Sequence, residues 1–523
     1  MMRGSILVGA LVLGFSLLQG QISPPLELPE VVVIGKEERA IPGGAKQPPQ
    51  PPAPLKGALL DSLNPLSKHG LVGFFPLPAF PSQLSLPQPV DRFVEGSLGQ
   101  YTSASLSGFA RWGGKTTLLA LAGYLNATQG HVREADSLGF GITMQARVLA
   151  LPETWFGQRG SGTVTGGVRW RQYQLFGDSG APRRLSFAVG LRGAFEARLN
   201  ALRYEVDADF SAFSLRQGQI MRSEQHMRVR LGALYPDSAL PAGGIASQLD
   251  IRLWEEQTQV VWEFLVPGIW ARSPWLFRGA AGMQLARLSR GQIHFLPALE
   301  GELQYGLSSR WRLVLAGWSR LQEKGWRELW EANPYVDLRT SPTSPHDRLA
   351  ARVALQWMPA AWGSLEGALQ VRSVARWWSW ERTEMGFALH TLPVTVWEAR
   401  VDAFARISEH MTVGGALQGG RATTSGGGDV AYYTPLKLEL TSAQRWMEKL
   451  GSRLGIEIVS SRSAGARERL PGYVRMWGEL YYELMPRMIL KAFLDNLLNA
   501  DIRHWSGYPE RGIFFAAAVR WNW

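Results

Sequence analysis

Two short stretches of this sequence carry residue types that perform chemistry in other proteins. The first, Gly113-Gly114-Lys115-Thr116, contains the Gly-Lys-Thr of a phosphate-binding loop. The first glycine of such a loop would stand where this chain has Phe109. A phosphate-binding loop also needs a strand before it and a helix after it, whereas residues 105–112 and 117–124 both alternate as strands do. We therefore predict a hairpin turn here.

The second stretch, Gly177-Asp178-Ser179-Gly180, has the order found around a serine nucleophile, but Asp, Ser and Gly are also the residues that turns favour. A catalytic triad needs an oriented His and Asp, and nothing around the histidines indicates one. No histidine has another within four residues, so the spacing of a local metal-binding pair is missing. The histidines are His69, His131, His226, His294, His346, His390, His410 and His504. We predict a turn, no enzyme, no metal site and no cofactor.

One charged row has the spacing of a strand face. Glu398, Arg400, Asp402 and Arg406 alternate with apolar residues. Such a row can line a lumen that selects a polar solute, or it can form ion pairs with neighbouring strands. Both interpretations place the four side chains on the inner face of a barrel.

The composition restricts the class of protein. The chain has 523 residues with 57 Gly, 22 Trp and no Cys, and 46% of its residues are hydrophobic. This excludes a disordered chain, a disulfide scaffold and a cysteine nucleophile. The formal net charge is +11, but the basic residues are dispersed, so we predict no nucleic-acid partner.

The first part of the chain differs from the rest. Residues 1–20 have a basic start and an apolar stretch too short to span a bilayer, which predicts a secretory signal peptide. Residues 21–57 form a Pro-rich tail that contains five residues suited to an extended strand: Glu30, Val31, Val32, Val33 and Ile34. Residues 58–91 show no period, and we expect them to lie partly in the lumen of a barrel.

From residue 92 to 523 short runs alternate apolar with polar or small residues, separated by Gly, Ser, Asp or Pro. About 22 such segments (20–22 strands), with aromatic residues at strand ends as in residues 377–380 and 521–523, predict a transmembrane antiparallel β-barrel. The fold class is all-β. A soluble propeller is the alternative, but we find no repeat of ~40–50 residues.

Residues near the C-terminus resemble a known family. Residues 493–499, Phe-Leu-Asp-Asn-Leu-Leu-Asn, are followed by a Gly-Tyr-Pro segment at 507–512 and by a last strand that ends in aromatics, as in TonB-dependent outer-membrane receptors. Residues 331–336 are similar to the Asn-Pro segment that precedes a strand in that family, and 29–35 resemble its TonB box. Residues 96–102 resemble receptor-like barrels of the Bacteroidota and Chlorobi kind.

The resemblance implies a barrel in the cell outer membrane, surrounded by lipid and lipopolysaccharide, that takes part in solute transport. It also implies a TonB-type periplasmic partner for Glu30–Ile34. The barrel-assembly machinery would recognise a signal in the final strand, formed by Phe515, Val519, Trp521 and Trp523. The interval between residues 35 and 92 is too short for the plug domain of the family, so we predict a plug-less or nearly plug-less relative.

This departure leaves a second functional hypothesis open. A barrel without a plug could serve as a structural or accessory platform for a surface lipoprotein or a secretion partner. Unchanged uptake after removal of the energising TonB protein would favour the platform over the transporter. A barrel enzyme would need a Ser/His or Asp/His cluster at its rim, and the sequence shows none.

Overall fold

The computed structural model describes residues 92–114, 116–131, 135–151, 159–175, 183–199, 202–235, 242–254, 257–272, 274–287, 292–360, 362–465 and 468–523. The predicted signal peptide, Pro-rich tail, TonB-box-like segment and irregular segment 58–91 lie outside these residues, as does the predicted turn at 177–180.

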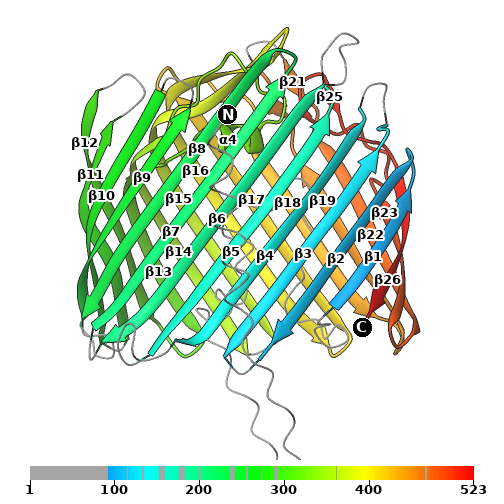
Figure 1. Ribbon diagram of the computed structural model, residues 1–523, viewed down its shortest axis with the longest axis horizontal. Coiled ribbons are helices and arrows are strands. Elements are labelled where there is room, and N and C mark those ends of the chain that lie inside the picture. The colour runs from blue at the N-terminus through cyan, green and yellow to red at the C-terminus, as the bar shows by residue number, and fades with distance from the viewer. Residues whose placement is uncertain are drawn as a thin grey trace, which may run out of the picture. The chain divides into compact units, whose positions relative to one another are not determined.

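Twenty-two strands form one antiparallel sheet (Figure 1). Those of the first half are β1 (Arg92–Gly99), β2 (Ser103–Gly113), β3 (Thr117–Thr128), β4 (Ser137–Leu151), β5 (Arg159–Tyr173), β6 (Arg184–Leu199), β7 (Leu202–Gln217), β8 (Ile220–Tyr235), β9 (Ala242–Trp254), β10 (Gln257–Arg272), β11 (Trp275–Arg287) and β12 (Ile293–Gly306). Those of the second half are β13 (Trp311–Leu321), β14 (His346–Ala360), β15 (Gly363–Thr383), β16 (Gly386–Ser408), β17 (Met411–Thr424), β18 (Leu436–Arg445), β19 (Leu450–Val459), β22 (Tyr473–Met485), β23 (Met488–Asp495) and β26 (Phe514–Asn522).

The sheet closes into a barrel because its first strand, β1, pairs with its last, β26. Two small strand pairs stand apart from the barrel sheet: β20 (Arg462–Ser463) with β21 (Arg469–Leu470), and β24 (Arg503–Trp505) with β25 (Tyr508–Pro509). One short helix, α4 (Trp326–Ala332), lies between β13 and β14. The predicted all-β antiparallel barrel of about 22 strands is confirmed. Among the residues that the structure describes, no helix is long and apolar enough to cross a membrane.

Alternation along the strands produces two chemically different barrel faces. On β7, Val206 and Phe210 are exposed on the outer face, while Asp207 and Asp209 of the same strand belong to the inner face. The outer face is apolar on the other strands as well, as at Ile142 and Leu369. An apolar outer face with a polar inner face is the pattern of a barrel surrounded by lipid.

The two ends of the barrel differ. At the end where β1 begins and β26 finishes, strands are joined by short connections such as 361–362 and 409–410. The longest connections, 322–345, 425–435, 460–472 and 496–513, all lie at the opposite end, which we call the mouth end. Exposed tryptophans are concentrated at the short-turn end, whereas Trp262 and Trp397 lie farther along β10 and β16. Those at the short-turn end are Trp112, Trp270, Trp275, Trp311, Trp362, Trp446, Trp521 and Trp523. Such a belt is typical of a membrane–water interface.

The predicted turn at Gly113–Thr116 is confirmed, because it joins β2 to β3 and the Gly114 N–H donates to the Thr117 carbonyl oxygen. The Asp-Asn-Leu-Leu-Asn segment is also a turn, which follows β23. Asn496 and Asn499 both have a positive φ, a conformation that Asn tolerates better than most residues. The Asn496 side chain bonds both the N–H and the carbonyl of Ala500. Backbone geometry therefore accounts for these residue types.

The seam between β1 and β26 is strengthened by an ion pair on the inner face. Lys491 Nζ of β23 lies 2.6 Å from Glu95 Oε2 of β1 and thus crosses β26, where Ala518 pairs with Lys491 in register and leaves room. Both charged side chains are largely shielded from solvent.

We expect this pair to stabilise the closed barrel. In a double-mutant cycle with Glu95→Gln and Lys491→Met, the coupling energy should be about 1 kcal/mol. The measurement is reversible urea unfolding in lipid vesicles. The control is the same cycle on Arg421 and Asp429, an exposed pair at the mouth end that should couple weakly. A seam coupling no larger than the control would contradict this role.

Candidate functional site

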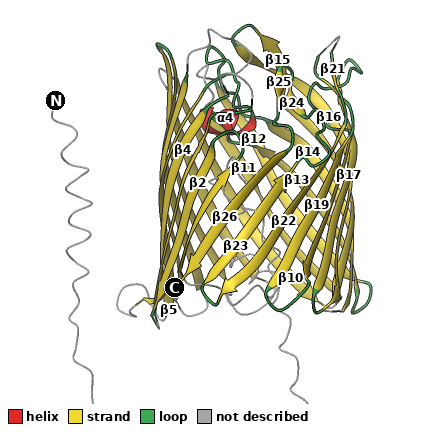
Figure 2. Cartoon of the chain, turned by 90° about the vertical axis from the view of Figure 1, so that its right-hand side faces the viewer, coloured by secondary structure: helices red, strands yellow, loops and turns green. Residues whose placement is uncertain are grey.

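The connection between β13 and β14 turns into the mouth end of the barrel. Residues 322–345, which we call the cap, contain α4, drawn in red inside the ring of strands in Figure 2. The sequence indicated uniform strand texture from residue 92 to 523, and this expectation is wrong for the cap. Three buried side chains at helical spacing, Trp326, Leu329 and Trp330, explain the helix, because they pack on the barrel wall.

The apolar side of the cap rests on inward-facing residues of β5 and β7. Phe213 and Leu215 of β7 are buried in the same cluster as Trp330, and the Phe213 and Trp330 ring centroids are 5.5 Å apart. Trp330 Nε1 donates to the Tyr173 hydroxyl at 2.7 Å, and that hydroxyl donates to the Pro334 carbonyl oxygen at 2.8 Å. The helix is therefore fixed by packing and by a continuous hydrogen-bond chain.

A second anchor holds Pro334. Arg184 of β6 is fully buried, and its Nη1 donates to the same Pro334 carbonyl at 2.7 Å. Residues 331–336, which resemble a family segment that precedes a strand, lie before β14 but do not lead into it directly. They finish α4 and continue the cap, where Val336 forms an isolated parallel bridge with Phe387 of β16.

The cap also contacts the nearly opposite side of the ring, at the hairpin of β15 and β16. Trp378 Nε1 donates to the Thr343 carbonyl at 2.7 Å, and Trp380 and Phe387 are buried in the cluster around α4. The prediction that residues 377–380 belong to a membrane-facing aromatic belt is therefore wrong for Trp378 and Trp380. A register shift between Val374 and Trp377 comes just before these two inward-facing tryptophans.

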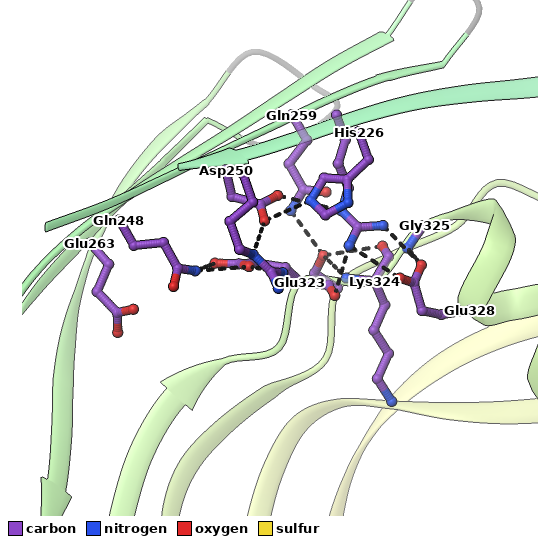
Figure 3. A network of polar contacts seen from close by, with 12 residues as sticks. His226, Gln248, Asp250, Gln259, Glu263, Glu323, Lys324, Gly325 and Glu328 are labelled. Atoms are coloured by element: carbon purple, nitrogen blue, oxygen red, sulfur yellow. Dashed lines mark hydrogen bonds and ion pairs between the residues drawn. The ribbon is translucent and has the colours of Figure 1, made fainter. Parts of the chain in front are cut away.

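Polar side chains of β8 and β9 hold the first residues of the cap (Figure 3). Arg252 of β9 donates from Nη1 to Glu328 Oε2 at 2.8 Å and to Glu224 Oε1 of β8 at 2.9 Å. Its Nη2 donates to the Glu323 carbonyl at 3.3 Å. Arg252 is 1% exposed and Glu224 is 3% exposed, so this buried guanidinium depends on its carboxylate partners.

The start of α4 needs a residue without a side chain. A Cβ atom at Gly325 would collide with the carboxylate of Glu224. With glycine there, the Glu224 carboxylate accepts the Trp326 N–H, and Glu328 Oε2 accepts the Gly325 N–H at 2.8 Å. Two carboxylates thus satisfy free N–H groups at the positive end of the helix.

A second polar group lies beside the first. Arg228 of β8 donates from Nε to Asp250 Oδ2 and from Nη2 to Glu323 Oε2, both at 2.9 Å. His226 Nε2 lies 2.8 Å from the same Asp250 oxygen. Gln248 Nε2 lies 3.4 Å from Glu323 Oε2. One guanidinium therefore joins a wall carboxyl group to a cap carboxyl group.

The two cap carboxyl groups have opposite electrostatic environments. Burial alone would raise the pKa of Glu328, but the Arg252 guanidinium holds the pKa of that carboxyl at about 2. Burial, together with the neighbouring Asp250 carboxylate, raises the pKa of Glu323 to about 8. Near neutral pH, Glu328 is therefore ionised and Glu323 retains its proton.

The structure places the predicted lumen row on the inner face of β16. Arg400 and Asp402 form an ion pair with Nε to Oδ2 at 2.6 Å, and Trp397 of the same strand is exposed on the outer face. The row of Glu398, Arg400, Asp402 and Arg406 lies toward the short-turn end and contributes nothing to the cap. That it guides a solute stays a prediction.

The other predicted site residues are not brought together with the cap. Phe515, Val519, Trp521 and Trp523 are exposed at β26 and the C-terminus, and their role in assembly stays a prediction. Glu30–Ile34 lie outside the described residues. Among the described residues, no three His, Asp or Glu side chains lie close enough to hold a metal ion.

The network around the cap was missed by the sequence analysis. Its members come from β8, β9 and the cap, and no spacing along the chain links Asp250 to Glu323. The one available signal was the helical spacing of Trp326, Leu329 and Trp330 within an otherwise alternating region.

Comparison with known proteins identifies the barrel. No protein-family model matches the chain, and no curated protein matches its sequence. Among solved structures, the ferric-catecholate import receptor Fiu from E. coli K12 is similar with a TM-score of 0.63 at 10% identity, over 83% of this chain and 82% of that chain. The chain has the barrel fold of TonB-dependent outer-membrane receptors.

Two further structures have the same fold. The copper transporter OprC has a TM-score of 0.64 at 11% identity, over 83% of this chain and 82% of that chain. The FrpB iron transporter from Neisseria meningitidis has a TM-score of 0.63 at 7% identity, over 83% of this chain and 81% of that chain. Among its described residues, this receptor-like barrel contains no plug domain.

The packing of α4 predicts that the cap can be loosened without opening the barrel. Trp330→Ala should cost about 3–5 kcal/mol of cap docking, because it removes a buried ring and a hydrogen bond to Tyr173. Amide hydrogen exchange in residues 322–345 should accelerate while β-strand amides remain protected. Trp311→Ala, at the exposed short-turn end, is the matched control and should leave cap exchange unchanged. Unchanged cap exchange in Trp330→Ala would contradict the assignment.

Proposed function

We propose that this protein lies in the outer membrane and helps a solute cross it, with the cap closing the path at the mouth end. The observation that carries the proposal is a closed 22-strand barrel with an apolar outer face and a charged inner face. Its likeness to solved import receptors and metal transporters supports the same conclusion. The proposal contains no catalytic step.

The orientation of the barrel in the membrane follows from the different lengths of the connections at its two ends. Outer-membrane barrels have short turns on the periplasmic side and long loops on the cell surface. The short-turn end, where β1 begins, would face the periplasm, and the cap would face the cell exterior. A signal peptide at residues 1–20 would direct export before its removal.

Ion pairs line the path below the cap. Arg192 pairs with Asp207, Arg352 pairs with Glu366, and Arg400 pairs with Asp402, all on inner faces. Together with Glu398 and Arg406 they would offer a polar solute a charged surface. The surplus of basic residues in the chain favours anionic solutes.

We propose partners for the outer face, for the last strand and for residues 30–34. The outer face would contact lipid and lipopolysaccharide. Phe515, Val519, Trp521 and Trp523 would be presented to the barrel-assembly machinery. Glu30–Ile34 would add as a strand to a TonB-type periplasmic protein.

Removing the cap tests the function directly. In a variant whose residues 324–343 are replaced by a short Gly-Ser linker, we expect single-channel conductance in planar bilayers to rise at least about tenfold, because a lumen of this strand number is wide enough to hold water. Trp330→Ala should give an intermediate value.

The control is deletion of residues 426–428, an exposed Gly-Gly-Gly segment of another mouth loop, which should leave conductance unchanged. A cap-deleted barrel that folds, shown by its gel mobility before and after heating, yet conducts no ions would overturn the transport proposal. That result would favour the platform for a surface lipoprotein or secretion partner.

The segment before β1 offers a separate test. We propose that residues 58–91 lie partly in the lumen, because the described residues contain no plug domain that would fill it. Deleting residues 58–91 should increase single-channel conductance in the cap-deleted background. If conductance is the same with and without the segment, the segment does not occupy the lumen.

A further inference from the structure

Two carboxyl groups and one guanidinium meet at the place where the cap leaves the wall. Glu323 stands two residues beyond the last residue of β13, at the first turn of the cap, and its side chain is 4% exposed. Asp250 of β9 is 1% exposed. Arg228 bridges the two with bonds of 2.9 Å to each.

We propose that Glu323 and Asp250 form a proton-dependent latch that holds the cap in the mouth and releases it as pH rises. The inference rests on the proposed function, because it describes how the same path would be regulated. Nothing in the apolar packing of α4 depends on pH, so the latch would act at the β13 end of the cap.

The number of charges supports a retained proton. The buried network contains four carboxyl groups, Glu224, Asp250, Glu323 and Glu328, and two guanidinium groups, those of Arg228 and Arg252. Arg252 donates to Glu224 and Glu328, and its Nε also lies 3.5 Å from Asp250 Oδ1. Arg228 is the guanidinium that donates to both Asp250 and Glu323. Four carboxylates beside two guanidinium groups would carry an excess negative charge in a cluster where Asp250 is 1% and Glu323 4% exposed, and a proton on one carboxyl group reduces that excess.

The groups that face Glu323 come from every element around it. Arg228 and, through Asp250, His226 come from β8, while Gln248, Asp250 and Arg252 come from β9. Arg320 of β13 lies nearby and pairs with Glu263 at 3.4 Å. Lys324 and Glu328 belong to the cap itself. His226 contacts Asp250 directly, so an experiment must separate its contribution from that of Glu323.

The direction of the pH effect follows from linkage. In the closed cap, burial and Asp250 raise the pKa of Glu323 to about 8, whereas a released, hydrated Glu323 would have the ordinary value of its class. The closed state therefore holds the proton more tightly. Closure is fully stabilised below the ordinary glutamate pKa, weakens as pH rises toward about 8, and changes no further above it.

The chain contains no cysteine, so one introduced thiol can report on the cap. Ser344→Cys places a thiol of similar volume at a buried position that contacts Lys324 at the charged start of the cap. Ser425→Cys places the reference thiol in an exposed loop at the same end of the barrel as the cap. The ratio of their labelling rates with a polar maleimide removes the pH dependence of the thiol itself. Full-length protein in lipid vesicles is used throughout.

We expect the labelling ratio to rise at least about tenfold between pH 5 and pH 9, since one pH unit of linked proton release corresponds to a factor of ten. Glu323→Gln cannot lose a proton and should keep the ratio low at every pH. Asp250→Asn removes the carboxylate that repels an ionised Glu323, so the labelling ratio should also depend less on pH. His226→Asn should retain the response.

The matched control is Glu439→Gln. Glu439 lies on β18, a strand distant from the latch, and is paired with Lys437 of the same strand. This variant should retain the full pH response. A response that persists in both Glu323→Gln and Asp250→Asn, or that is lost in His226→Asn, would overturn the latch. A flat ratio in the unaltered chain would also overturn it.

The outcomes for latch and transport are separate. If labelling depends on pH as expected but the cap-deleted barrel carries no current, the latch stands and the transport proposal fails. If the cap-deleted barrel conducts but labelling is independent of pH, transport stands and the latch fails.

Discussion

An apolar outer face forces this sheet to close on itself. A strand edge in lipid would leave backbone N–H and C=O groups without partners, and only pairing of β1 with β26 removes both edges. Closure at this strand number has a cost, because the inner faces are then too far apart to pack against each other. The remaining features of the described chain follow from the need to line and cover that wide lumen.

The inner face of the barrel wall is apolar where it contacts the cap. Along β7 the inner face begins with charged residues such as Asp207 and Asp209 and ends with Phe213 and Leu215, which are buried beneath α4. The same change occurs on β15, where Trp378 and Trp380 contact the cap. The mouth end of the barrel therefore contains a hydrophobic core, and the outer faces of the strands around it are apolar as well.

The sequence allowed the strands to be predicted because each one alternates locally, and the strand number and barrel class followed from counting them. It did not allow the cap to be predicted. An inward Trp380 and an outward Trp521 look the same in a period of two, since the contact that distinguishes them lies far away in the chain. The carboxyl group of Glu323 likewise acquires its partners only when residues 322–345 turn into the mouth toward β8 and β9.

The two sides of the cap are attached by different forces, and this difference limits how it can move. Aromatic packing and the bonds to Pro334 hold the middle of the cap. Charged groups hold its start, where Glu323 and Asp250 share one guanidinium. A change of charge can loosen only the second attachment, so the cap would swing about its aromatic side. A purely apolar cap would close the mouth as firmly but would have no way to respond to its surroundings.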